Sequence, residues 1–156
     1  MQKMKVHYHG SVLDIFHNEV AKFGTRETGG VLLGWIENEL IVVAKATDSG
    51  PNAIHEKIYF RTDSNYIDMV IEMEHANSNG KLSYIGEWHT HPQMNPKPSQ
   101  IDLNSLGEIV ESSGQINLLL IIGAIDFTKE VFAEQSISIV KSPDDDRFFE
   151  LEPFVS

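Results

Sequence analysis

An almost unbroken apolar run, INLLLIIGAID at residues 116–126, sets the first limit on the architecture of this chain. A strand with one solvent-facing side alternates apolar and polar residues, whereas a strand covered on both faces is apolar nearly throughout. The run therefore predicts a strand that is buried on two sides. Other segments of the chain must supply its cover.

Hydrophobic periodicity predicts a strand, a helix and a hairpin in the N-terminal part. Residues 4–9 alternate as in a strand. The helix that follows has Ser11 to cap its start, Gly24 to cap its end, and one inward face made of Leu13, Phe16, Val20 and Phe23. Residues 27–48 are predicted to form a hairpin with a polar turn at 37–39.

The later elements are predicted, in order, as a short strand at 57–61, a helix that Asp63 caps and that ends by Gly80, a strand at 82–91, a proline-stiffened loop at 92–98, a helix at 99–114 and a strand at 131–140. The last strand is expected to pair with 116–126 through a turn at 127–130. The two helices are expected to turn these residues inward: Tyr66, Ile67, Val70, Ile71 and Met73, then Leu103, Leu106, Ile109 and Val110. Strands and helices mix without regular strand–helix–strand alternation, which predicts the α+β class.

The length and composition fit one domain over residues 1–156, because 156 residues with 41% hydrophobic content can build one core. There is no apolar run of membrane-spanning length, and the start MQKMKVHYHG lacks the features of a signal peptide, so a cytoplasmic protein without membrane partners is expected. The acidic and aromatic tail, 142–156, is expected to be a solvated end. Its apolar residues offer the alternative of docking on the domain or on a partner: Phe148, Phe149, Leu151 and Phe154.

Charge and cysteine content exclude several classes of function. The chain has no cysteine, so disulfides, thiolate metal ligands and a cysteine nucleophile are excluded. Twelve basic against 23 acidic residues give a net charge of -11, which repels phosphate backbones and makes nucleic acid an unsuitable partner. A metal site in this chain must use histidine, carboxylate or water.

Two histidines separated by one residue, His89 and His91, end the predicted strand at 82–91. Alternate residues of a strand point the same way and lie about 6.5 Å apart at the backbone, so two imidazoles can converge on one ion. Ten residues separate His91 from Asp102, whose carboxylate on the next helix can return to that ion. Two histidines and one aspartate leave a fourth position for water, as in catalytic zinc sites, so we predict one Zn²⁺ per chain with a bound catalytic water.

Such a site needs a carboxylate beside the metal that accepts a proton from the water and returns it to the leaving amine. Glu27 is the candidate, because it heads a glycine-rich strand where backbones can approach closely. A surface carboxylate next to Arg26 is the alternative interpretation. His55-Glu56 begins a second metal motif, HExxH, but Tyr59 occupies the place of its second histidine, so that motif fails.

Together, ETGGVLLG at 27–34 and GEWHTHPQMNPKPSQID at 86–102 resemble the JAMM (MPN+, Mov34/JAB) metalloprotease family. The resemblance implies an α+β, cytidine-deaminase-like fold, in which a mixed, mostly antiparallel curved sheet is flanked by about three helices. It implies that His89, His91 and Asp102 bind zinc, that Glu27 is the general acid and base, and that Ser99 helps to hold the oxyanion. Ser99 and Asp102 also fit a helix capping box, a purely structural alternative.

Family members cleave isopeptide or peptide bonds after the glycine-ended C-terminus of ubiquitin or a ubiquitin-like protein. The short chain is similar to prokaryotic JAB domains, particularly the deconjugating peptidases of antiphage CBASS operons, which implies a ubiquitin-like or glycine-ended protein substrate and E1/E2-like partner proteins. The segments around 62–80 and after 107 are shorter than in relatives that cut polyubiquitin. A peptidase that processes sulfur-carrier proteins and a non-catalytic MPN scaffold are the alternatives.

The residues just before His89 are expected to part between two faces. Alternation sends Trp88 into the core and Glu87 to the side of the metal. Glu87 is then either a support for a metal ligand or an edge residue.

Overall fold

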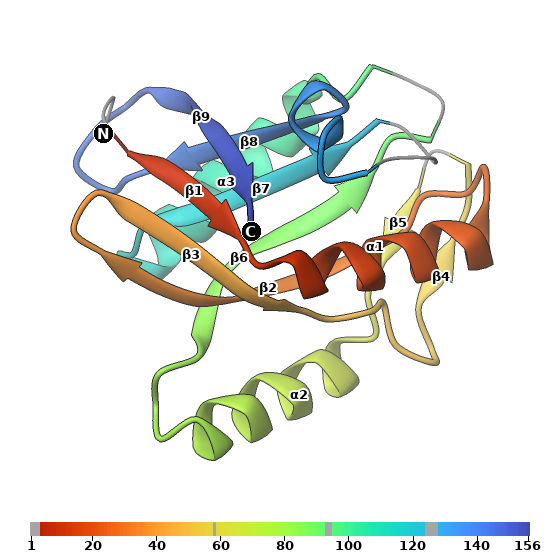
Figure 1. The fold of residues 1–156 in the computed structure, drawn as a ribbon, viewed down its shortest axis with the longest axis horizontal. Helices are drawn as coiled ribbons and strands as arrows, with labels where there is room; N and C mark the ends of the chain where they lie inside the picture. The colour runs from red at the N-terminus through yellow and green to blue at the C-terminus, as the bar shows by residue number, and fades with distance from the viewer. Residues whose placement is uncertain (1–3, 58, 93–94, 124–127) are drawn as a thin grey trace.

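Within residues 4–57, 59–92, 95–123 and 128–156, which the computed structural model describes, seven strands close into a barrel (Figure 1). The elements in chain order are β1 (Lys5–Tyr8), α1 (Gly10–Phe23), β2 (Gly29–Glu37), β3 (Leu40–Ala46), β4 (Ile54–His55), β5 (Phe60–Arg61), α2 (Ser64–Asn77), β6 (Ser83–Thr90), α3 (Gln100–Ser113), β7 (Asn117–Ile122), the 3₁₀ turn η1 (Phe132–Glu134), β8 (Ser136–Lys141) and β9 (Phe148–Val155). The order around the barrel is β1-β3-β2-β6-β7-β8-β9, and β4 and β5 form a separate small ribbon.

The barrel is mixed and mostly antiparallel, as the family resemblance implies. β1 runs parallel to both β3 and β9, and β6 runs parallel to β7. The other neighbouring strands are antiparallel. Together with the helices, this sheet confirms the α+β class, although the prediction of a curved sheet did not include its closure.

β7 confirms the prediction of a strand buried on both faces, since each of its residues is buried. Leu118, Leu120 and Ile122 face the barrel interior, where they join the main core. Leu119 and Ile121 face the other way and pack beneath α3. The apolar run therefore separates two cores, and polar residues at alternate positions would have left one of them incomplete.

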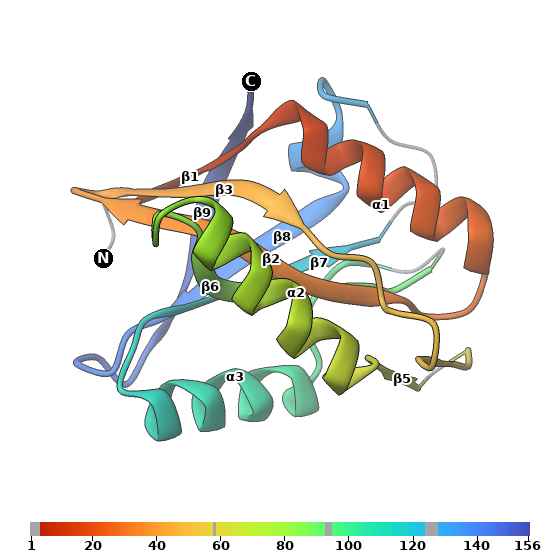
Figure 2. The same ribbon diagram turned by 90° about the horizontal axis from the view of Figure 1, so that it is seen from below.

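Each helix covers a different part of the barrel. α1 adds Val12, Phe16 and Val20 to the interior core, while α3 lies over the outer faces of β7 and β8. α2 lies over the outer face of β2, mainly through Ile67. Figure 2 shows α1 and α3 on opposite sides of the molecule. This arrangement leaves a strip of the outer face of β6 uncovered between α2 and α3.

The C-terminal tail is not a solvated end, which corrects the main expectation for residues 142–156. Residues 148–155 form β9, which pairs with β8 on one side and with β1 on the other. Leu151 is only 3% exposed and belongs to the interior core, and Phe149 packs against it. Phe154 remains 45% exposed. The alternative of docking on the domain is thus confirmed for part of the tail.

Helix ends and faces differ in detail from the predictions. α1 begins two residues early, with His9 rather than Ser11 at the N-cap position and no side-chain cap, while Gly24 ends it as expected. Asp63 caps α2 as predicted, but Met73 is 48% exposed rather than inward, because α2 contacts the sheet along a narrow line.

The segment predicted as a strand at 131–140 begins with η1, so β8 starts only at Ser136. The short strand predicted at 57–61 is confined to β5. Parts of the predicted segments at 57–61, 92–98, 116–126 and 127–130 lie outside the described residues. Among the described residues, no helix has both the length and the apolar character needed to cross a bilayer.

We expect Leu151→Ala to lower the free energy of unfolding by about 2–5 kcal/mol, because it opens a cavity in the core that β9 completes. Glu150→Ala, one residue away on the exposed side of the same strand, should change it by less than about 0.5 kcal/mol. Urea unfolding of both variants measures the difference. Equal effects would show that β9 does not belong to the core.

Candidate metal centre

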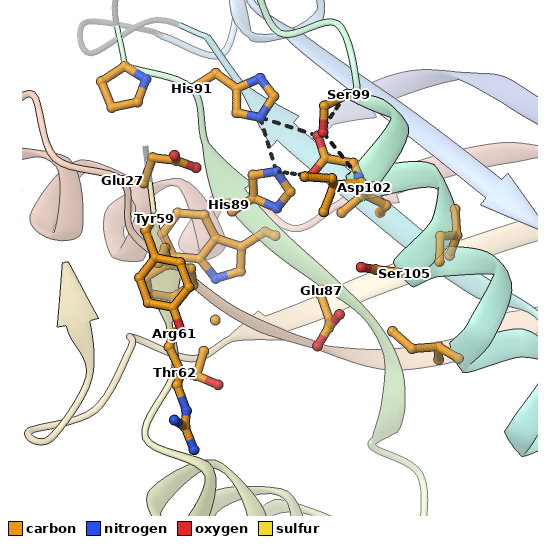
Figure 3. Close-up of a pocket in the computed structure, with 18 of the residues that line it drawn as sticks. Glu27, Tyr59, Arg61, Thr62, Glu87, His89, His91, Ser99, Asp102 and Ser105 are labelled. Carbon is orange, nitrogen blue, oxygen red and sulfur yellow. Dashed lines mark hydrogen bonds and ion pairs between the residues drawn. The ribbon is translucent and has the colours of Figure 1, made fainter. Parts of the chain in front are cut away.

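β6 sends alternate side chains to opposite faces, as the sequence predicts. Trp88 is buried in the interior core, where its indole N–H donates to the Thr47 carbonyl at 3.0 Å. Thr90 also points away from the cleft and is buried. Glu87 and His89 face the uncovered strip between α2 and α3, where both line a cleft of about 770 Å³ (Figure 3). The strand is therefore buried on one face, through Trp88 and Thr90, and lines the cleft on the other.

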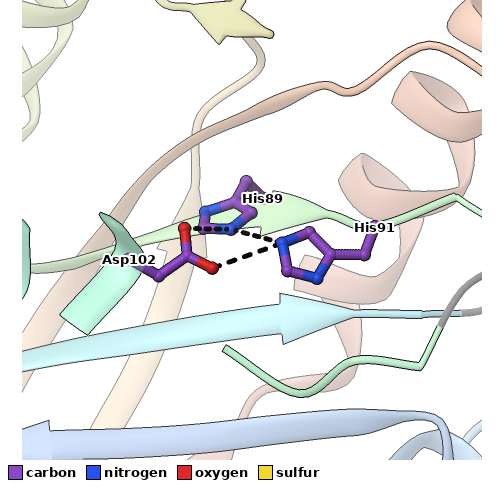
Figure 4. A group of neighbouring side chains, drawn as sticks. All are labelled: His89, His91 and Asp102. Carbon is purple, nitrogen blue, oxygen red and sulfur yellow. Dashed lines mark hydrogen bonds and ion pairs between the residues drawn. The ribbon is translucent and has the colours of Figure 1, made fainter. Parts of the chain in front are cut away.

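The side chains of His89, His91 and Asp102 meet at one end of this cleft (Figure 4). The two Nε2 atoms lie 3.3 Å apart. His89 Nε2 lies 3.3 Å from Asp102 Oδ1, and His91 Nε2 lies 3.3 Å from Asp102 Oδ2. The structure thus brings together the three residues that the sequence predicted to meet.

The spacing of these atoms fits one small metal ion. A tetrahedral zinc ion with bonds of ~2.0–2.1 Å requires its ligand atoms to lie about 3.3–3.4 Å apart. The 3.3 Å between the two Nε2 atoms matches that edge, and each Nε2 lies at the same distance from one oxygen of Asp102, Oδ1 for His89 and Oδ2 for His91. Within the described part of the chain, no further His, Cys, Asp or Glu joins the group, so a fourth corner is left for water or substrate.

Asp102 reaches the histidines from the first turn of α3, where it completes a capping box. Its Oδ2 accepts the Ser99 N–H at 2.8 Å, and its own N–H donates to Ser99 Oγ at 3.1 Å. The capping alternative and the proposed ligand position are therefore compatible, because the cap holds the carboxylate still while both oxygens remain near the imidazoles. Among the described residues, none accepts the Ser99 hydroxyl hydrogen.

Glu27 lines the same cleft, and Figure 3 shows its carboxylate turned toward the two imidazoles. The close pairing of β2 with β6 places it there. Gly29 lies opposite His89, and a Cβ on Gly29 would stand 2.1 Å from the Trp88 carbonyl oxygen. Only glycine allows this approach, so the glycine-rich stretch has the close backbone contact that the sequence predicted.

Burial and neighbouring charges shift several pKa values in the cleft. Burial raises the pKa of Glu27, although His89 and His91 act in the opposite direction. Burial also raises the pKa of Glu87. Asp102 is half-buried, which acts to raise its pKa, but hydrogen bonds from the two histidines lower the pKa of this carboxyl below its ordinary range.

Further along the cleft lie residues that the sequence did not single out. Tyr59 and Arg61 come from the segment around β5, and Ser105 comes from the outer side of α3 (Figure 3). The sequence gives no sign that these residues meet, since Tyr59 and Arg61 reach the cleft through the small ribbon and Ser105 through the packing of α3 over β7. The alternation of β6 did predict the side to which Glu87 points.

We expect zinc affinity to fall as the pH is lowered. The hydrogen bond to Asp102 raises the pKa of His91, so the His91 imidazole keeps its second proton to a higher pH than an ordinary histidine. Zinc must displace that proton in order to bind. Below the raised pKa of His91, the apparent affinity should drop about tenfold per pH unit for each proton that zinc displaces from its ligands.

Titration against a competing chelator between pH 5.5 and 8 measures this slope. His7→Ala, which removes a histidine outside the cleft, should reproduce the wild-type curve. A zinc affinity independent of pH would contradict the involvement of His91.

Comparison with known proteins gives consistent results. The model for the family of prokaryotic homologs of the JAB domain matches residues 9–139. A protein of Sinorhizobium fredii named as a probable metalloprotease is 31% identical over 104 residues, which is 65% of this chain and 63% of that protein. A Vibrio cholerae protein named CD-NTase/cGAS isopeptidase is 34% identical over 105 residues, which is 66% of this chain and 65% of that protein. The chain thus spans less than two thirds of the length of these relatives.

The fold also has a solved counterpart. The solution structure of a Desulfitobacterium hafniense protein superimposes with a TM-score of 0.65 over 97% of this chain and 92% of that chain. The sequence identity is 15%, so this likeness concerns the fold alone.

Proposed function

The chain belongs to the family of prokaryotic homologues of the JAB domain, and from this premise we propose that it is a zinc-dependent peptidase or isopeptidase. Its proposed substrate is a protein with a ubiquitin-like or glycine-ended C-terminus, cut after the terminal glycine. The observation that carries the proposal is the group of His89, His91 and Asp102, with atoms 3.3 Å apart beside the carboxylate of Glu27. A structural site has no need of such a carboxylate or of an open cleft.

In this proposal His89, His91 and Asp102 hold the zinc ion. When bound, zinc acts as a Lewis acid that polarises the scissile carbonyl and acidifies the attacking water. Glu27 accepts the proton of that water and returns it to the leaving amine, a role that the raised pKa of this partly buried carboxyl favours. The same carboxylate thus serves both halves of the reaction.

Ser99 is proposed to donate a hydrogen bond to the oxyanion. Its oxygen already accepts the Asp102 N–H, which holds the position of this oxygen. Its hydrogen is left for a substrate oxygen, and donors of this kind stabilise the transition state without reorganising. Ser99 would then cap α3 and assist catalysis at once.

The names of the relatives support a protein substrate. Isopeptidases cut bonds between a modifier and a target protein, and the Vibrio cholerae relative carries the name of one. We propose a cytoplasmic role in a CBASS-like or other ubiquitin-like conjugation system, in which E1/E2-like proteins make the bond that this chain cuts. A chain end of glycine residues suits a cleft in which the backbone must pass close to the metal.

We expect Glu27→Gln to lose about 10²–10⁴-fold in kcat while it keeps its zinc, because the substitution removes only the proton acceptor. His89→Ala should lose both zinc and activity. Metal analysis by mass spectrometry and cleavage of fusions between a glycine-ended ubiquitin-like domain and a reporter, with and without chelator, measure both. If Glu27→Gln cut these fusions at the wild-type rate, the proposed base would be wrong.

A further inference from the structure

We propose that His55 and Glu56, supported by the buried carboxylate of Glu19, hold the peptide groups of Glu27 so that its side chain faces the metal centre. His55 is thus a positioning residue. This inference rests on the proposed function, since it concerns how the proposed base is held. It also gives a role to the His55-Glu56 pair, which the sequence presents as half of a failed metal motif.

The two residues bond both peptide groups of Glu27. The Glu27 N–H donates to the Glu56 carbonyl at 2.8 Å. On the other side, His55 Nδ1 lies 3.0 Å from the Glu27 carbonyl oxygen. A carbonyl only accepts, so Nδ1 carries the proton of the imidazole. The backbone of the proposed base is therefore fixed from the small ribbon, which also lines the cleft.

The second nitrogen of His55 leads to a buried carboxylate. His55 Nε2 lies 3.1 Å from Ser49 Oγ, and the Ser49 N–H donates to Glu19 Oε1 at 3.2 Å. Glu19 Oε2 accepts the Thr28 hydroxyl at 2.6 Å. Glu19 is 5% exposed, and Ser49 Oγ also lies 3.3 Å from its Oε2, so Ser49 and Thr28 together surround this buried carboxylate. The Glu19 carboxylate on α1 thus binds both Ser49, which contacts His55, and Thr28, which follows Glu27.

Ring contacts hold His55 in one orientation. Its imidazole stacks on Phe23 at the end of α1, with ring centres 3.4 Å apart, and lies 5.5 Å from the ring of Phe60. The contact explains why Phe23, predicted to face the core, instead ends α1 partly exposed beside the ribbon. With aromatic rings on two sides, the imidazole is oriented so that Nδ1 points toward Glu27 and Nε2 toward Ser49.

The residue after Glu27 is tied to the metal centre itself. The Thr28 N–H donates to Thr90 Oγ1 at 3.1 Å, and the Thr90 N–H donates to the Thr28 carbonyl at 2.9 Å. Thr90 stands between the two histidines of the centre. With Thr28 fixed to β6, the orientation of Glu27 depends on the contacts with His55 and Glu56. A shift of about 1 Å in a catalytic group can cost 10²-fold in rate.

Two substitutions of His55 separate positioning from a general structural role. In His55→Asn the side-chain NH₂ can take the place of Nδ1 and donate to Glu27, whereas in His55→Gln the longer side chain reaches Ser49 instead, where its oxygen takes the place of the accepting Nε2. Both substitutions remove the imidazole ring that contacts Phe23 and Phe60. Any loss that comes only from the missing ring should therefore be the same in the two variants.

We expect His55→Gln to lose about 10–100-fold in kcat on a glycine-ended ubiquitin-like fusion, with KM within about twofold of wild type and zinc content unchanged. His55→Asn should keep kcat within about threefold of wild type. Independently of activity, amide hydrogen exchange in metal-free protein should be faster at Glu27 in His55→Gln than in His55→Asn.

Equal kcat values and equal exchange rates in the two variants would overturn the positioning role. A loss that appears in KM alone, or with loss of zinc, would overturn it as well. Failure of the proposed function has a different signature, because wild type and Glu27→Gln would then cleave alike, while the exchange of the Glu27 amide, which donates to Glu56, would still report on how firmly the ribbon holds the Glu27 backbone.

Discussion

The close pairing of β2 with β6 is the contact on which the rest of the site depends. Gly29 lies against His89 without room for a Cβ. One residue further along, the Thr90 N–H donates to the Thr28 carbonyl and the Thr28 N–H donates to the Thr90 hydroxyl oxygen. Through this pairing, a carboxylate and two imidazoles far apart in the sequence share one cleft. A side chain at Gly29 would push the strands apart and separate the proposed base from the centre it serves.

The start of α3 also holds a residue of the site in place. A carboxylate near a helix N-terminus is stabilised by the free N–H groups there, and Asp102 accepts one of them from Ser99. This bond fixes the carboxylate before a metal arrives, so little ordering remains to be done on binding. α3 itself is held by its packing over β7, which the sequence predicted to be apolar on both faces. The core and the centre are thus parts of one arrangement.

Much of the site could be predicted because its signals are local. The alternation of a strand decides that His89 and His91 point together, and the capping pattern decides where α3 begins. Long-range pairing could not be predicted in this way. The alternating residues of β9 fit an exposed segment as well as a strand, and only pairing with β1 and β8 decides between them. The role of His55 is likewise not evident from the sequence, because its partners come from α1, from the segment before β2, from the loop before β4 and from β5.

The central claim is that one zinc ion binds two imidazoles and one carboxylate and keeps a position for water. X-ray absorption at the zinc edge of the stoichiometrically loaded protein tests it most directly. The account predicts two nitrogen ligands from imidazole and two oxygen ligands at ~2.0–2.2 Å, one oxygen being that of Asp102. A spectrum that requires three or four imidazoles, or that is unchanged in Asp102→Ala, would contradict it.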